Sequence, residues 1–248
     1  MLEAINLCKS FDSLLVTDHV SFRLEKGERR AVLGPNGAGK TTLFNLLTGQ
    51  LAPAKGEVWL DGKNISACRV EERARMGLAR SFQKNSLFNG LTVGENLSLA
   101  AAAVLGRSAS LLRDSLRDKS VRRQVTEVAA QVGLLDLLKA PVAHCSYGTR
   151  RQLEVGIALA SKPKVLLLDE PASGAGPSMI EALHGLLKSL PRDLTILIIE
   201  HDMDLALNVA DRITVLNYGK VVFEGTPQET RSSPLVNEIY LGDWDADA

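Results

Sequence analysis

The sequence lacks any long hydrophobic run. Its longest nearly unbroken apolar stretch, residues 97–105, is far shorter than the ~20 residues that a helix needs to cross a bilayer. The N-terminus also lacks the charged and apolar pattern of a signal peptide. We therefore expect a soluble, cytoplasmic chain that reaches a membrane only by docking on a membrane protein.

The chain has no excess charge of either sign, because 29 Lys and Arg residues balance 29 Asp and Glu residues. Nothing in this balance favours a polyanion, so nucleic acid is not expected as a main ligand. Cysteine is scarce as well: Cys8, Cys68 and Cys145 are odd in number, far apart and in no metal-ligand spacing. We expect reduced, buried thiols rather than a disulfide framework.

What the chain does have is a hydrophobic content of 45% over 248 residues, which is enough for a sizeable core. The first sixty residues are strand-rich, helical patterns dominate residues 84–160, and two later apolar runs around a helical pattern indicate a βαβ unit. The expected strands are residues 2–7, 20–24, 29–33, 57–60, 165–168, 196–199, 212–216 and 220–223. The expected helices are residues 40–47, 92–105, 120–132, 149–160 and 179–190, with a further short helix near the C-terminus.

The pattern Gly-x-x-x-x-Gly-Lys-Thr lies between a predicted strand and a predicted helix. Glycines let successive N–H groups point at one cluster of phosphate oxygens, and the helix N-terminus adds partial positive charge. A glycine-rich turn with an exposed lysine is the alternative, but the strand-loop-helix order favours a phosphate loop in which Lys40 holds the terminal phosphates and Thr41 binds Mg²⁺. The candidate nucleotide-binding residues are Gly34, Pro35, Asn36, Gly37, Ala38, Gly39, Lys40, Thr41 and Thr42.

Polar residues follow the two later apolar runs. Asp169 and Glu170 belong at the carboxyl edge of the sheet, where a phosphate loop also lies. Alone, such a pair is more often a solvated loop; after a phosphate loop it predicts Asp169 as a Mg²⁺ ligand and Glu170 as the base for the attacking water. His201 is placed to contact a γ-phosphate, although a histidine at a strand end is usually structural.

Further motifs occur in the order of a known family. Residues 145–152, Cys-Ser-Tyr-Gly-Thr-Arg-Arg-Gln, are similar to the signature sequence of ABC ATPases, and they precede Leu-Asp-Glu-Pro at residues 168–171. Gln83 resembles the glutamine of the family's Q-loop. Phe11 resembles the aromatic residue on which adenine stacks, with a core phenylalanine as the alternative. The resemblance covers nearly the whole chain.

This resemblance implies an α/β fold, a P-loop NTPase of the ABC type with a RecA-like parallel sheet core, an antiparallel β subdomain and a helical subdomain. It implies a single ATP-binding domain over residues 1–248. Residues 1–83 and 161–248 then form the nucleotide-binding core with the β subdomain, and residues 84–160 form the helical subdomain that carries the signature.

The resemblance also implies ATP hydrolysis, with ATP and Mg²⁺ bound. The implied catalytic residues are Lys40, Gln83, Glu170 and His201, and the implied metal ligands are Thr41, Gln83 and Asp169. Ser146 and Gly148 would close over the ATP of a second ATPase subunit, identical or different, because a helix N-terminus offers N–H groups to a γ-phosphate. Transmembrane permease subunits, an extracytoplasmic substrate-binding protein and a peripheral location on the inner face of the cell membrane are implied in the same way.

Several motifs resemble those of branched-chain or hydrophobic amino-acid importers, namely residues 79–83, 91–97, 199–203 and 240–242. The ATPases of urea or short-amide importers share much of this pattern, and that of the lipopolysaccharide exporter shares the Ser-Tyr-Gly signature. A non-transport ABC ATPase is less expected, because long coiled-coil insertions and tandem cassettes are absent. The basic stretch at residues 106–123 is either a solvated surface or a contact with a membrane subunit or anionic headgroups.

Three positions depart from the family pattern. Tyr147 takes the place of the first signature glycine, and Thr149 takes that of the usual glutamine. Gly176 stands where the family usually has Asp or Asn, which removes a side chain expected to connect the two ATP sites. Glu170 and His201 are both present, so we still expect a hydrolytic site.

Overall fold

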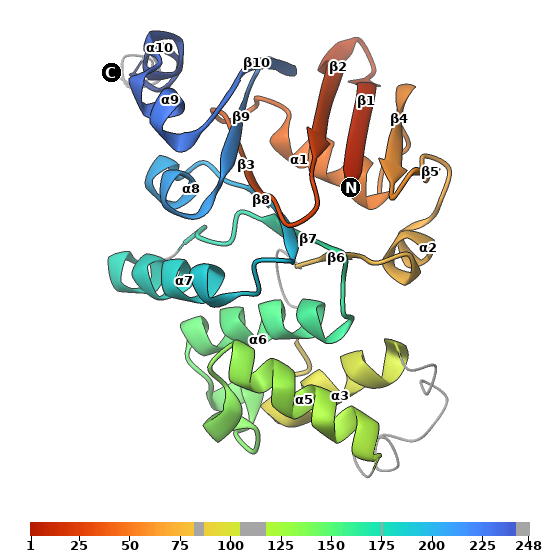
Figure 1. The fold of residues 1–248 in the computed structure, drawn as a ribbon, viewed down its shortest axis with the longest axis vertical. Helices are drawn as coiled ribbons and strands as arrows, with labels where there is room; N and C mark the ends of the chain where they lie inside the picture. The colour runs from red at the N-terminus through yellow and green to blue at the C-terminus, as the bar shows by residue number, and fades with distance from the viewer. Residues whose placement is uncertain (82–86, 105–117, 175, 242–248) are drawn as a thin grey trace.

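The computed structural model describes residues 1–81, 87–104, 118–174 and 176–241. Two sheets and a group of helices make up this part of the chain. Figure 1 shows the smaller sheet at one end, helices α3 (Val93–Val104), α5 (Lys119–Gln131) and α6 (Tyr147–Ala160) at the other, and the larger sheet between them. The predicted fold class, a parallel sheet core with an antiparallel sheet and a set of helices, is confirmed.

The larger sheet has six strands in the order β10-β9-β3-β8-β7-β6, and all neighbours are parallel except β9 and β10. Every residue of β3, β7 and β8 is buried, as expected for central parallel strands covered on both faces. The strands are β3 (Arg29–Leu33), β6 (Leu78–Arg80), β7 (Val165–Asp169), β8 (Thr195–Ile199), β9 (Arg212–Asn217) and β10 (Lys220–Gly225).

The smaller sheet is antiparallel, with the order β2-β1-β4-β5. Its inner face joins the core that contains the first long helix, α1, through residues such as Leu2, Leu7 and Val20. The register between β1 and β2 shifts three times along their length, so the ladder contains bulges. The strands are β1 (Leu2–Phe11), β2 (Leu14–Leu24), β4 (Lys55–Leu60) and β5 (Lys63–Asn64).

Helices cover the larger sheet and extend beyond it. Those of residues 93–160 pack on one another, and Gly156 of α6 allows close contact, because a Cβ there would lie 3.1 Å from Leu97 Cδ2 of α3. Among the described residues, no helix combines the length and the apolar composition needed to cross a membrane. The helices are α1 (Lys40–Thr48), α2 (Val70–Arg75), α3 (Val93–Val104), α5 (Lys119–Gln131), α6 (Tyr147–Ala160), α7 (Pro177–Ser189), α8 (Met203–Val209), α9 (Pro227–Ser232) and α10 (Pro234–Leu241), with short 3₁₀ turns at Leu135–Leu137 and Val142–His144.

Arg73 of α2 ties this small helix to the end of α1. Arg73 is 1% exposed, and its guanidinium donates to the carbonyls of Leu46 and Leu47, each at 2.7 Å. It also donates to the carbonyls of Ser66 and Cys68. The last carbonyls of a helix have no partner within it, so one buried cation satisfies the carboxyl end of α1 and fixes the helix that follows the phosphate loop.

We predict that Arg73→Met lowers the free energy of unfolding by about 2–4 kcal/mol, because several buried carbonyls lose their donors together. Arg75→Met is the matched control, since Arg75 lies on the same helix with its side chain exposed. That change should stay within about 0.5 kcal/mol of the parent. Urea unfolding measures both, and equal effects of the two substitutions would contradict the capping role.

Candidate functional site

The phosphate loop predicted from the sequence connects β3 to α1. Gly39 precedes the helix with a φ of +99°, a conformation that residues with a Cβ rarely adopt. No side chain caps the N-terminus of α1. The first N–H groups of the helix, together with its positive dipole end, are therefore available to an anion.

Lys40, the first residue of α1, folds back over this loop. The residue is 5% exposed, and its ammonium donates to the carbonyls of Gly34 at 2.6 Å and Pro35 at 2.9 Å. Burial lowers the pKa of Lys40, and the charges of Glu170, Glu200 and Asp169 act in the opposite direction. The structure thus brings the loop lysine close to the carboxylates at the ends of β7 and β8.

Asp169 is the last residue of β7 and is 4% exposed. Its Oδ1 has no hydrogen-bond partner among the described residues. Burial, together with the charges of Glu170 and Glu200, raises the pKa of Asp169 to about 6, while Lys40 and Arg80 act in the opposite direction. A buried carboxylate with an unused oxygen fits a hard cation such as Mg²⁺, and the hydroxyl of Thr41 is the same kind of ligand.

Glu170 faces the phosphate loop across a small cavity. The cavity holds about 190 Å³, and Glu170 lines it together with Val16 and the loop residues 36–42. Glu170 has a φ of +44°, and its N–H donates to the carbonyl of Ile199 at 2.8 Å. A left-handed non-glycine residue is strained by about 1–2 kcal/mol, so the surrounding contacts hold this carboxylate at the cavity wall.

Glu200 is a residue of the site that the sequence reasoning did not assign. It is fully buried; one oxygen accepts the N–H of Ala172 at 2.8 Å and the other accepts the N–H of His201 at 3.0 Å. Burial raises its pKa, while these backbone donors lower it. Glu200 therefore joins the end of β8 to the segment after Glu170. The same signal that marked Asp169, an acid directly after a buried apolar strand, also marks Glu200.

His201 projects from the same edge of the sheet. Its side chain is 51% exposed, and Nδ1 lies 3.7 Å from the Oε2 of Glu200. The backbone hydrogen bond to Glu200 fixes its position, and its exposure leaves the ring free to meet a ligand. His201 does not line the cavity of Glu170 and the phosphate loop.

The signature residues lie elsewhere on the chain. Ser146 caps α6, because its Oγ accepts the N–H of Thr149 at 3.2 Å. Ser146 and Gly148 line a second cavity of about 180 Å³ between α6 and α7, not the cavity at the phosphate loop. Tyr147 donates from its hydroxyl to the carbonyl of Ser173 at 3.1 Å, which links the signature to the segment after Glu170.

Two predicted residues remain, Phe11 and Gln83. Phe11 ends β1 with 45% of its surface exposed, and the ammonium of Lys9 lies 5.8 Å from the centre of its ring. Gln83 lies outside the residues that the structure describes. The roles assigned to both from the sequence stay predictions.

Comparison with known proteins supports the same interpretation. Residues 17–173 match the ABC transporter family. The branched-chain amino acid transport ATP-binding proteins LivG of Salmonella typhimurium and BraF of Pseudomonas aeruginosa are 37% and 36% identical to the chain, with 98% of each chain covered. The lipopolysaccharide export ATP-binding protein LptB of Acidithiobacillus ferridurans is 35% identical over 98% of this chain and 97% of its own.

A solved structure gives the same result. The ADP conformation of MJ1267, an ATP-binding cassette of an ABC transporter, superposes with a TM-score of 0.83 at 30% identity, covering 98% of both chains. The predicted resemblance is thereby confirmed. The chain belongs to the ABC transporter ATP-binding family, and it is an ATPase.

Proposed function

We propose that the chain is the ATP-hydrolysing subunit of an ABC importer that takes up branched-chain or other hydrophobic amino acids. The observation that carries this proposal is the similarity to LivG and BraF over 98% of each chain. The 35% identity to LptB keeps a lipopolysaccharide exporter as the alternative, together with the urea or amide importers expected from the sequence.

In the proposed reaction, Lys40 leaves the carbonyls of Gly34 and Pro35 and binds the terminal phosphates of ATP, which the N–H groups of the loop and of α1 also hold. Mg²⁺, when bound, neutralises developing negative charge on the phosphates. Thr41 and Asp169 are the described residues that would hold it, and Gln83 is the further ligand expected from the sequence. Glu170 orients the attacking water and accepts its proton, and His201 contacts the γ-phosphate.

The signature completes the site of another subunit in this proposal. Ser146 is exposed at the N-terminus of α6, away from the phosphate loop of its own chain. The positive end of this helix is therefore available to the γ-phosphate of ATP bound by a partner. Phe11 would stack on adenine. Gly176 precedes α7 without a side-chain cap and offers no group to connect the two sites.

We extend the proposal to the organisation of the chain and its partners. Residues 1–83 and 161–248 act as the nucleotide-binding core with the β subdomain, and residues 84–160 act as the helical subdomain. The core binds a second ATPase subunit, and the pair docks on transmembrane permease subunits at the inner face of the membrane, served by an extracytoplasmic substrate-binding protein. Of the basic stretch at residues 106–123, residues 118–123 are described, and Arg122 and Arg123 are exposed on α5.

Glu170→Gln should retain ATP binding and lower the rate of hydrolysis at least about 100-fold, because the substituted side chain can hydrogen-bond a water but cannot take its proton. Glu181→Gln is the matched control, since Glu181 is an exposed acid of α7. Phosphate release measures hydrolysis, and sedimentation with ATP measures the closed dimer that the first variant should accumulate. Hydrolysis at the parental rate by Glu170→Gln would remove the residue from the proposed mechanism.

Asp169→Asn should stabilise the ligand-free chain at pH 7.5. Folding raises the pKa of Asp169 from a usual 3.8 to about 6, so the ionised carboxylate present at pH 7.5 opposes folding. This cost is absent well below the unfolded pKa, grows between the unfolded and the folded pKa, and stays constant above the folded one. We expect the melting temperature to rise by at least about 2 °C.

The same variant should lose the additional stabilisation that Mg²⁺ gives in the presence of ATP. Thermal melts with ATP alone, and with ATP and Mg²⁺, measure this increment. Well below pH 3.8, where the carboxyl is protonated in both the folded and the unfolded state, the parent and Asp169→Asn should melt together. An equal Mg²⁺ increment in both proteins would contradict the proposed metal ligand.

The transported substrate is tested in the organism that encodes the chain. Replacing the gene by its Lys40→Ala form should abolish uptake of labelled leucine, isoleucine and valine, while the chain remains present at the parental level. Loss of urea uptake alone, or a defect in lipopolysaccharide export with normal leucine uptake, would favour the corresponding alternative instead.

A further inference from the structure

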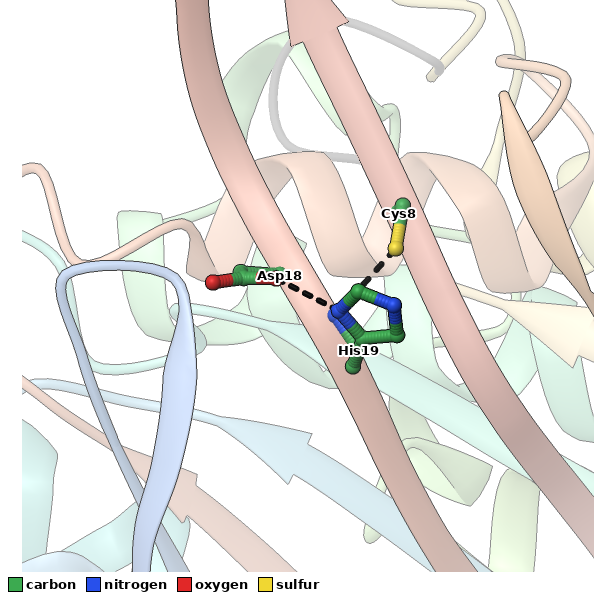
Figure 2. A group of neighbouring side chains, drawn as sticks. All are labelled: Cys8, Asp18 and His19. Atoms are coloured by element: carbon green, nitrogen blue, oxygen red, sulfur yellow. Dashed lines mark hydrogen bonds and ion pairs between the residues drawn. The ribbon is translucent and has the colours of Figure 1, made fainter.

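Three side chains with metal-binding atoms meet on the antiparallel sheet, outside the nucleotide site. Cys8 lies on β1, and Asp18 and His19 lie on β2. Figure 2 shows the three side chains directed toward one another, and a sulfur, a carboxylate oxygen and a ring nitrogen all lie within 4.8 Å of one another.

A backbone irregularity produces this grouping. Successive side chains of a regular strand point to opposite faces, so Asp18 and His19 would normally be separated. His19 instead has a φ of +53°, close to one of the register shifts between β1 and β2. The left-handed residue turns its ring back to the side of its neighbour, and the His19 Nδ1 lies 2.6 Å from the Asp18 Oδ1.

Hydrogen bonds hold the three side chains in place. The N–H of His19 donates to the Sγ of Cys8 at 3.3 Å, and the Cys8 thiol donates to the carbonyl of Asn6 at 3.6 Å, so a bound metal ion would replace this thiol proton. The His19 side chain is 65% exposed, which gives an ion a path from solvent to the buried sulfur.

We propose that Cys8, Asp18 and His19 bind Zn²⁺, with water in the fourth position. Thiolate, imidazole and carboxylate are the ligands that Zn²⁺ prefers, and three protein ligands with one open position are a common arrangement around it. The ion takes the place of the proton shared by His19 and Asp18, as metals do when they replace protons on their ligands.

One charge opposes the ion. The ammonium of Lys220 lies 3.2 Å from the other oxygen of Asp18, Oδ2, and its side chain is 63% exposed. Lys220 therefore leaves Oδ1 to the metal but repels a cation by its proximity. Removing the charge of Lys220 should therefore strengthen metal binding. A purely structural role of Cys8, Asp18 and His19 does not predict this result.

The site is close to the phosphate loop. The N–H of Asp18 donates to the carbonyl of Gly219 at 2.8 Å, and the N–H of Gly219 donates to the carbonyl of Ala38 at 3.0 Å. Two backbone hydrogen bonds thus connect a metal ligand to the loop.

Titration with Co²⁺ tests the proposal, because a cysteine thiolate bound to Co²⁺ gives a charge-transfer absorption in the near ultraviolet that oxygen ligands do not give. The full chain is titrated under reducing conditions with excess Mg²⁺ and without nucleotide. We expect one Co²⁺ per chain with this absorption, and its loss when Zn²⁺ displaces Co²⁺. An absent absorption in the parent would overturn the proposal.

The variants locate the site. Cys8→Ser should abolish the absorption. His19→Asn should weaken the affinity for Co²⁺ at least about tenfold. Because asparagine tolerates the positive φ at position 19, this variant still tests the site if a buried serine at position 8 impairs folding. Lys220→Gln should tighten binding at least about twofold. Cys68→Ser and His144→Asn are the matched controls and should bind as the parent does. An absorption that persists in Cys8→Ser, or unchanged affinity in His19→Asn or Lys220→Gln, would contradict a cation at this position.

Discussion

The register of the parallel strands determines the position of the functional groups. Val32 of β3 and Asp169 of β7 both pair with Ile199 of β8, so these strands reach the same level at their carboxyl ends. The phosphate loop begins directly after β3, while Glu170 and Glu200 directly follow the other two strands. A shift of one residue in any of these strands would move its polar group by about 3.3 Å and rotate it to the other face of the sheet.

The electrostatics of this edge follow from that arrangement. Lys40 faces three carboxylates, those of Asp169, Glu170 and Glu200, all in a partly dehydrated environment. Backbone N–H groups satisfy Glu200, whereas Asp169 keeps an unused oxygen and a raised pKa. This excess of negative charge destabilises the ligand-free chain, but it suits the site to bind a cation together with the phosphates of ATP. Such opposition between stability and function is common in active sites.

The sequence predicted those elements that depend on local interactions and missed those that depend on contacts with distant parts of the chain. Apolar runs identified β7 and β8 to within a residue, because strands buried on both faces are mostly apolar. The bounds of β3 were also predicted, although its first two residues are the buried arginines Arg29 and Arg30. The short elements α2, β5, β6 and α8 were not predicted. Strand β6 has three residues and forms only because β7 pairs with it, and α2 depends on the contacts of Arg73 with α1.

The same distinction applies to the candidate site. The spacing of the phosphate loop is local, and the structure places Lys40 and Glu170 at one cavity as predicted. The separation of Ser146 from that cavity depends on how α6 packs, which the local pattern does not contain. Cys8 and His19 lie on different strands, and a left-handed residue in a bulged ladder brings them together, so no spacing rule could have associated them.

A tight backbone contact joins the antiparallel sheet to the phosphate loop. The carbonyl of Val16 on β2 lies 2.6 Å from the position that a Cβ of Gly39 would occupy and 2.5 Å from that of Gly219. Glycine at both positions is what allows β2, the loop and the β9–β10 turn to pack this closely. Val16 also lines the cavity of Glu170, two residues before Asp18. The strand that carries Asp18 and His19, two of the proposed zinc ligands, therefore also contacts the phosphate loop directly at Val16.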